Sequence, residues 1–409
     1  MLARQIVHRA LLFFSSLIAV SLIAELGLRL ALAPQLAVRR FNPEPHVFAL
    51  PDSELGWDNP RSLEISYSDG FFHGEIHFDE DALRLNSGVT TFRDGWVNLL
   101  FIGDSTTASL EVNDAETIPA LVERALRKRG EEVNVLNLGV RGYGTGQTVD
   151  KAIRIAELRG AREAIYLFVP NDVYETNVAK TWGFPHSKPL YLWDSILEKF
   201  IRRPVEPLSI HEGRIVILDD ACRPYLHEGA TASMPRREGD SPLADSYLYR
   251  AYYRFVEIER IHASAVRVEP DDRIRNGESW SHGFIAAYLD DGTTRNRCPE
   301  YFTRQMRFHL ERLREDAALE KIYVVHFPND RVRRMQREGG SPNVQMFKNL
   351  LELGVVDSYL DLNEEATSRG DSLYRLRCPS DPHFCRAGNE WIASRFLEHF
   401  ESELDRTAP

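Results

Sequence analysis

The sequence has 409 residues, of which 43% are hydrophobic and 27% charged, a composition typical of a globular protein that buries a sizeable core. Its formal net charge is -11. This balance argues against a nucleic-acid-binding surface, because such a surface needs clustered basic residues to replace the counterions of the phosphates. We therefore expect no nucleic-acid partner.

The N-terminus differs from the rest of the chain. A short basic tail, residues 1–9, precedes an apolar segment, residues 10–33, that is long enough to cross a bilayer as one helix. Glu25 and Arg29 lie four positions apart, so they can pair on one helix face. A cleaved signal peptide is the alternative, but these two charges interrupt the approach to its cleavage site. We expect a single-pass signal anchor, with the bulk of the chain periplasmic or otherwise outside the cytoplasm.

Residues 34–95 are rich in Pro, Asp, Ser and Gly and contain short alternating stretches such as EISYSDGFFHGEIHF. This pattern favours an extended or small β lead-in between the anchor and a larger domain.

From residue 96 onward, short apolar runs alternate with helix-like segments. WVNLLFIG, VNVLNLG and AIYLFVP end at Gly or Pro and are typical of buried parallel strands. The stretch between the first two begins with a capping residue, Asn113 or Asp114, and ends at Gly130, and a second helix is predicted near Gln147–Leu158. This alternation predicts a parallel α/β sheet with helices on both faces.

The alternation is lost after Asn171. Residues 178–300 are expected to form a long insertion, a lid or substrate wall, which includes the strand-like piece GRIVILDDA and the helix-like piece SYLYRAYYRFVEIERIHA. The α/β rhythm then returns with YFTRQMRFHLERLREDA, KIYVVHFP, MFKNLLELG and VVDSYLDL, and a final helix is predicted over Ala387–Leu404. We therefore expect one domain over residues 96–404, interrupted by the insertion.

Four cysteines fit an oxidising compartment. Cys378 and Cys385 are seven positions apart, and Cys222 and Cys298 lie in a different region. We expect the disulfides Cys378–Cys385 and Cys222–Cys298, and reduced, buried thiols are the alternative.

The sequence predicts no cofactor and no metal site. The pairs His211-Glu212 and His227-Glu228 begin like the zinc motif H-E-x-x-H, but neither has the second histidine. The loop GVRGYGTG lacks the full G-x-G-x-x-G pattern of a dinucleotide-binding turn.

Polar residues gather at the ends of the predicted strands and before the last helix, where ligands bind in open α/β sheets. A serine hydroxyl becomes a nucleophile when a histidine takes its proton, and a carboxylate can hold the tautomer of that histidine. Fixed donors then stabilise the oxyanion that forms. The sequence offers all of these groups in Gly103-Asp104-Ser105, in the loop from Asn137 to Gly144, in Asn171-Asp172, and in Asp381 and His383.

These motifs resemble, in residues and in order, blocks I, II, III and V of the SGNH hydrolases, the GDSL-type esterases and lipases. The matching stretches are FIGDSTTASLEV, LNLGVRGYGTGQ, FVPNDV and SDPHFCRAGNEWIA, within roughly residues 96–174 and 320–402. The anchor also resembles that of a membrane-anchored bacterial subgroup. The resemblance implies a three-layer α/β/α sandwich with a flavodoxin-like parallel sheet.

The resemblance also implies roles for individual residues. Ser105 is the implied nucleophile, and His383 is the implied base. Gly142 and Asn171 are the implied oxyanion donors, beside the backbone N–H of Ser105. The family often has an aspartate three positions before the histidine, where this chain has a serine. Asp381, two positions before the histidine, is therefore the expected acid of a triad, and a Ser-His dyad is the alternative.

The function implied is that of a membrane-anchored serine esterase, which removes acyl groups through an acyl-serine intermediate. The compartment and the habit of the family suggest acetyl esters on a cell-envelope or extracellular glycan, or a small-molecule ester. One alternative is an O-acyltransferase that passes the acyl group to or from a polysaccharide. Another is a non-catalytic glycan-binding protein on the same fold.

Overall fold

The structure is a computed structural model. It describes residues 2–36, 45–68, 72–89, 92–177, 187–205, 214–218, 224–228, 248, 299–328, 341–370, 376–378 and 383–400. The helix-like piece expected over residues 246–263 lies outside these ranges except for one residue.

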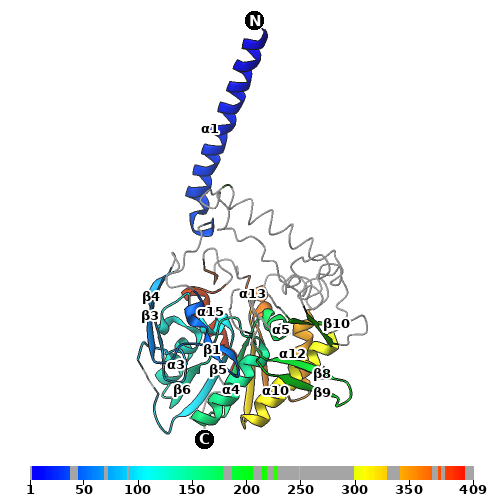
Figure 1. Ribbon diagram of the computed structural model, residues 1–409. Helices are drawn as coiled ribbons and strands as arrows, with labels where there is room; N and C mark the ends of the chain where they lie inside the picture. Colours follow the sequence, from blue (N-terminus) through cyan, green and yellow to red (C-terminus); the bar gives the residue numbers. More distant parts are fainter. Residues whose placement is uncertain are drawn as a thin grey trace.

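A five-stranded parallel sheet forms the centre of the fold (Figure 1). Its strands lie in the order β13-β12-β7-β5-β6, which is 2-1-3-4-5 when they are numbered along the chain and read from the other edge. This is the flavodoxin-like order, with its switch point beside the first strand. The bounds are β5 (Val97–Gly103), β6 (Val133–Asn137), β7 (Glu163–Phe168), β12 (Lys321–His326) and β13 (Ser358–Asp361).

Helices cover both faces of this sheet, which confirms the α/β class predicted from the sequence. One layer contains α4 (Thr145–Arg159), α10 (Pro299–Asp316) and α12 (Pro342–Glu352). The other contains α3 (Ile118–Lys128), α13 (Leu362–Ser368) and α15 (Arg386–His399).

The residues of β5 show how the chain separates the two layers. Leu100 and Ile102 belong to the hydrophobic core under α4 and α10, whereas Leu99 and Phe101 belong to the core under α3 and α15. Successive side chains of a strand point to opposite faces, so an uninterrupted apolar run supplies two cores at once.

Local capping fixes the ends of the helices. The 3-10 turn η2 (Asp114–Glu116) precedes α3, and the side chain of Thr117 accepts a hydrogen bond from the amide of Ala120 to begin α3. At the other end of the domain, the predicted helix to Leu404 is too long. Helix α15 ends at His399, and Phe400, which leaves the helical conformation, packs its ring 4.8 Å from that of Phe396.

The lead-in is built from short antiparallel pairs. It contains η1 (Pro45–Phe48), β1 (Leu50–Asp52) paired with β2 (Gly56–Asp58), and β3 (Leu63–Ser68) paired with β4 (His73–Phe78). Trp57, Tyr67 and Ile76 are fully buried. The lead-in therefore packs as part of the folded domain and is more than an extended connection.

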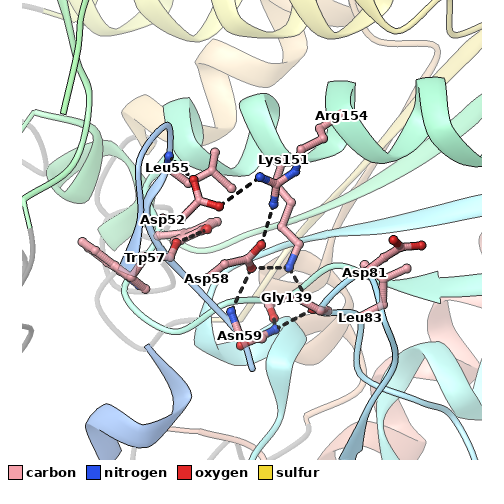
Figure 2. A network of polar contacts seen from close by, with 12 residues as sticks. Asp52, Leu55, Trp57, Asp58, Asn59, Asp81, Leu83, Gly139, Lys151 and Arg154 are labelled. Carbon is pink, nitrogen blue, oxygen red and sulfur yellow. Dashed lines mark hydrogen bonds and ion pairs between the residues drawn. The ribbon is translucent and has the colours of Figure 1, made fainter. Parts of the chain in front are cut away.

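Ion pairs, one of them buried, join the lead-in to α4 (Figure 2). The ammonium of Lys151 lies 2.6 Å from a carboxylate oxygen of Asp58 and donates to the carbonyl of Ala82 at 3.0 Å. Arg154, one turn further along, contacts Asp58 at 2.5 Å and Asp52 at 3.1 Å. Burial lowers the pKa of Lys151, and the Asp58 carboxylate opposes that effect.

Parts of the insertion are also described. Strands β8 (Leu190–Asp194) and β9 (Lys199–Arg203) form an antiparallel pair, as do β10 (Arg214–Leu218) and β11 (Pro224–Glu228). β10 lies in the strand-like piece that the sequence predicted. Tyr191 of β8 and Phe200 of β9 belong to the core under α4 and α10, so this hairpin is anchored on the domain.

The N-terminal helix α1 (Leu2–Leu36) projects away from the domain, with the N-terminus at its far end (Figure 1). Its stretch Leu12–Leu30 has a mean hydropathy of 1.7 and is long enough to cross a membrane, a property that signal sequences share. Glu25 and Arg29 pair at 2.9 Å, as their spacing predicted.

Candidate active site

The turn after β5 explains the Gly-Asp-Ser motif. Gly103 has a φ of +155°, and a Cβ atom there would lie 2.2 Å from Oγ1 of Thr107 and 2.9 Å from the carbonyl oxygen of Leu167. No other residue fits this position without a shift of the backbone. Asp104 caps the short helix α2 (Ser105–Ala108) by accepting from the amide of Thr106 at 2.9 Å. The turn therefore holds Ser105 at the carboxyl end of a central strand.

His383 reaches this serine from the other end of the chain. Its Nε2 atom lies 2.7 Å from Oγ of Ser105, which is hydrogen-bond distance. Cys378 and Cys385 form a disulfide on either side of the histidine, and the amide of Cys378 donates to the carbonyl of His383 at 2.8 Å. The histidine thus lies in a short, cross-linked loop directly before α15. The expected partners Cys222 and Cys298 lie outside the described residues.

A carboxylate that the sequence reasoning missed lies on the other side of the imidazole. Oε1 of Glu111 is 3.4 Å from Nδ1 of His383, and the side chain of Glu111 is 1% exposed. Glu111 belongs to the same motif as Ser105, in the apolar stretch ASLEV, and an acid in such a stretch is the signal that could have identified it. Asp381, the expected acid of a triad, lies outside the described residues and stays a prediction.

Asn171 and Ser105 both contact the carboxylate of Asp104. It begins α5 (Asn171–Thr176), and its side-chain Nδ2 donates to Oδ2 of Asp104 at 2.9 Å. The Oγ atom of Ser105 lies 3.4 Å from the same oxygen. Because an amide nitrogen carries two hydrogens, Asn171 can hold this bond and still offer a second donor.

Asp172, the residue after Asn171, stabilises the turn between β7 and α5. It is fully buried, and its Oδ2 accepts from the Tyr166 hydroxyl at 2.9 Å and from the Val169 amide at 3.1 Å. Burial first, and then the negative charge of Asp104, raise the pKa of Asp172 well above its ordinary value. Asp172 therefore binds its proton more tightly in the folded protein than in the unfolded chain.

The loop between β6 and α4, which carries Gly142, packs closely between two parts of the site. A Cβ atom on Gly139 would lie 2.2 Å from the amide of Ala108, and one on Gly144 would lie 2.3 Å from the amide of Thr176. Gly142 itself has a φ of +74°. The loop therefore lies against α2 on one side and α5 on the other, and the position of Gly142 as an oxyanion donor stays a prediction.

The lead-in holds this loop from outside. The indole Nε1 of Trp57 donates to the carbonyl of Arg141 at 3.0 Å, and the Tyr143 hydroxyl donates to the carbonyl of Trp57 at 2.5 Å. The side-chain amide of Asn59 donates to the carbonyl of Gly139 at 2.9 Å, an arrangement visible beside the ion pairs in Figure 2. The backbone of the expected oxyanion loop is thus fixed by side chains of the lead-in.

One group of possible metal ligands occurs among the described residues. Glu64, Glu75 and His77 of the β3–β4 hairpin bring ligand atoms within 4.8 Å of one another. Both carboxylates are exposed, and Nδ1 of His77 is already 2.7 Å from a carboxylate oxygen of Asp114. The hairpin provides no enclosed site, and we assign no metal to it.

Comparison with known proteins gives distant similarities. The sequence matches no profile of a protein family, and no curated protein matches it. Among solved structures, TesA aligns over 75% of this chain and 99% of its own, at 9% identity and a TM-score of 0.34. AlinE4, an SGNH-hydrolase family esterase, aligns over 20% of this chain and 45% of its own, at 26% identity and a TM-score of 0.18. A mutant of AlinE4 aligns over 21% and 46%, at 24% identity and a TM-score of 0.19.

The aligned part of this chain thus spans less than half the length of AlinE4. Similarity at this level leaves the geometry of the site as the basis for assigning a function.

Proposed function

We propose that this protein is a serine ester hydrolase of the SGNH type. The observation that carries the proposal is the 2.7 Å separation between Oγ of Ser105 and Nε2 of His383. A nucleophile within hydrogen-bond reach of a base is the geometric requirement for acyl transfer through a serine. The flavodoxin-like strand order supports the proposal, because Ser105 and Asn171 follow the two strands β5 and β7 at its switch point.

The reaction follows from this geometry. His383 takes the proton of Ser105 while Oγ attacks the ester carbonyl carbon, and the histidine then returns that proton to the departing alcohol. Water repeats the sequence on the acyl-serine, which releases the acid and regenerates the serine. The oxyanion of each tetrahedral intermediate is stabilised by the backbone N–H groups of Ser105 and Gly142 and by the second N–H of Asn171.

The location and substrate belong to the same proposal. Helix α1 acts as a single-pass anchor, and the catalytic domain lies outside the cytoplasm. Two observations support this placement: the stretch Leu12–Leu30 is apolar and none of it is buried, and the disulfide Cys378–Cys385 is typical of an oxidising compartment. An enzyme placed there meets acyl esters, acetyl esters above all, on envelope or extracellular glycans.

An O-acyltransferase is the second candidate, and one contact favours it. Lys188, at the start of the described part of the insertion, is buried and donates to the carbonyl of Gly142 at 3.5 Å and to Glu175 at 2.7 Å. The insertion therefore adjoins the oxyanion loop. A wall at this place excludes water from the acyl-serine, which is the condition for passing the acyl group to a sugar hydroxyl instead.

The test compares the full-length protein in detergent with its Ser105→Ala variant. The release of p-nitrophenol from p-nitrophenyl acetate is measured with and without a glycan acceptor, and Ser87→Ala, a change of an exposed serine, is the matched control. Hydrolysis that depends on Ser105 and ignores the acceptor supports the esterase. A slow rate that rises with acceptor and gives acetylated glycan supports the transferase. Equal rates for wild type and Ser105→Ala contradict both.

A further inference from the structure

We propose that Glu111 is the carboxylate that positions His383, an inference that rests on the proposed function. The two nitrogens of the imidazole face two different groups. Nε2 lies 2.7 Å from Oγ of Ser105, and Nδ1 lies 3.4 Å from Oε1 of Glu111. Serine, histidine and glutamate therefore follow one another in the order that a catalytic triad requires.

Burial makes Glu111 effective in this role. Its side chain is 1% exposed, and that of His383 is 16% exposed. Water screens a pair at this depth far less than a pair on the surface. The carboxylate favours the tautomer with a hydrogen on Nδ1, which leaves the lone pair of Nε2 facing the serine hydroxyl, and it stabilises the imidazolium that forms during attack. The distance between Nδ1 of His383 and Oε1 of Glu111 is longer than that of a short hydrogen bond. Hydrogen bonds between catalytic groups are often long in structures without substrate.

A buried arginine holds the segment that carries Glu111. Arg84, in the lead-in, has a fully buried side chain. Its guanidinium donates to the carbonyls of Ala108 and Ser109 before the glutamate, and to the carbonyl of Val112 after it. Its Nε atom donates to the carboxylate of Asp114 at 3.0 Å.

Arg84 therefore hydrogen-bonds to the backbone on both sides of position 111. Ser109, two positions before Glu111, adopts a left-handed conformation, with φ of 49°, and its hydroxyl donates to the carbonyl of Thr106 at 2.6 Å. A non-glycine residue in this conformation is retained where the surroundings determine it. The segment after α2 is thus shaped to turn back toward the site.

The charge of Arg84 also fits this role. Burial lowers its pKa, and the carboxylates of Asp114, Glu111 and Glu116 oppose that change. The guanidinium thus lies within the field of Glu111. A fixed cation behind a buried carboxylate compensates part of the cost of desolvating it. Asp104, which accepts a hydrogen bond from Asn171, adds a further negative charge on the serine side of the site.

The inference decides between two candidate acids for His383. Asp381 is the acid that the spacing of the last motif predicted, and Glu111 is the acid that the structure places against Nδ1. The variants Glu111→Gln and Asp381→Asn remove one negative charge each with almost no change of shape. Glu116→Gln is the matched control, because Glu116 lies in the same segment and is more exposed.

The experiment measures kcat and KM on p-nitrophenyl acetate and the pKa of His383 by NMR, all on the full-length protein. We expect Glu111→Gln to lower kcat by about 10²–10⁴ with little change in KM, by analogy with the loss of the triad acid in serine proteases. The pKa of His383 should fall, because the imidazolium loses its anion. Asp381→Asn and Glu116→Gln should change kcat by less than about threefold. Glu111→Asp, which keeps the charge and shortens the reach, should lose less activity than Glu111→Gln.

Two results would overturn the inference. One is a large loss of kcat in Asp381→Asn beside near-normal turnover in Glu111→Gln. The other is an unchanged pKa of His383 in Glu111→Gln. If the wild type hydrolyses no ester, the proposed function fails, and the titration of His383 still decides whether Glu111 is its partner. If Glu111→Gln does not fold, Glu111→Asp and Asp381→Asn decide by the same two measurements.

Discussion

The Nε2 atom of His383 lies 2.7 Å from Oγ of Ser105, although 278 positions separate the two residues in the chain. The packing of the last helix produces this contact. Phe396 of α15 packs its ring 5.5 Å from that of Phe101 in β5, the strand that ends just before Ser105. The loop before α15 is thereby brought to the carboxyl end of the central strand, where the serine begins α2.

The side chain of Asn171 should act on turnover and not on folding. We expect Asn171→Ala to lower kcat for p-nitrophenyl acetate by about 10²–10³, because one oxyanion donor is lost. KM should change little, since the donor acts mainly on the transition state. Asn349→Ala, on the outer helix α12, is the control. A normal kcat in Asn171→Ala would remove this residue from the oxyanion site.

Asp172 should make the stability of the protein fall with rising pH. Its pKa is raised in the folded state, so above about pH 4, where the unfolded chain loses this proton, the folded protein keeps it. The stability that the bound proton contributes is lost as the pH rises through the folded pKa. Asp172→Asn has no proton to lose, and its amide oxygen can keep the bonds from Tyr166 and Val169.

The measurement is the free energy of unfolding in urea at pH 5 and pH 8, for wild type and Asp172→Asn. The variant should gain stability relative to wild type at the higher pH. An identical pH dependence in the two proteins would show that Asp172 ionises normally.

Lys151 should be important for stability because it is buried with Asp58. Replacement by methionine leaves the Asp58 carboxylate without its closest cation, although Arg154 remains beside it. Breaking a buried pair by removing one partner costs about 3–5 kcal/mol, and the remaining arginine places this change near the lower value. Urea unfolding measures the cost. Lys128→Met, on the exposed end of α3, is the control, and equal losses in the two variants would refute a special role for the pair.

The disulfide Cys378–Cys385 should hold His383 in position. The double change Cys378→Ser with Cys385→Ser opens a loop of seven positions, for which chain entropy predicts a loss of about 2–3 kcal/mol of stability. We expect a lower kcat as well, because the histidine lies within that loop. Treatment of the wild type with a reductant should reproduce the loss of kcat, and the double variant should not respond to it. Full activity in the double variant would contradict this role.

The central fold could be predicted from the sequence because its signals are local. The apolar runs of β5, β6 and β7 and the periodic face of α3 lie within single segments, so their order along the chain indicated the parallel sheet. The end of α15 could not be read in this way. Phe400 leaves the helical conformation there, and its ring packs against Tyr323, which is distant in sequence.

The candidate site shows the same division. Ser105 and His383 each belong to a recognisable short motif, and the structure places their side chains in contact. Glu111 carries only a weak local signal, an acid within an apolar stretch, because its role depends on a turn held by Arg84 from the lead-in. Lys151 is a second example, since a lysine in a helix is ordinarily expected on the surface, and only the fold brings Asp58 beneath it.

Labelling with a fluorophosphonate tests the central claim, that Ser105 is a nucleophile activated by His383. The full-length protein is treated with the reagent, and the adduct is located by peptide mass spectrometry. We predict one adduct, on Ser105, which is absent from Ser105→Ala and forms far more slowly in His383→Ala. The absence of an adduct on Ser105, or labelling that proceeds equally fast without His383, would contradict the account.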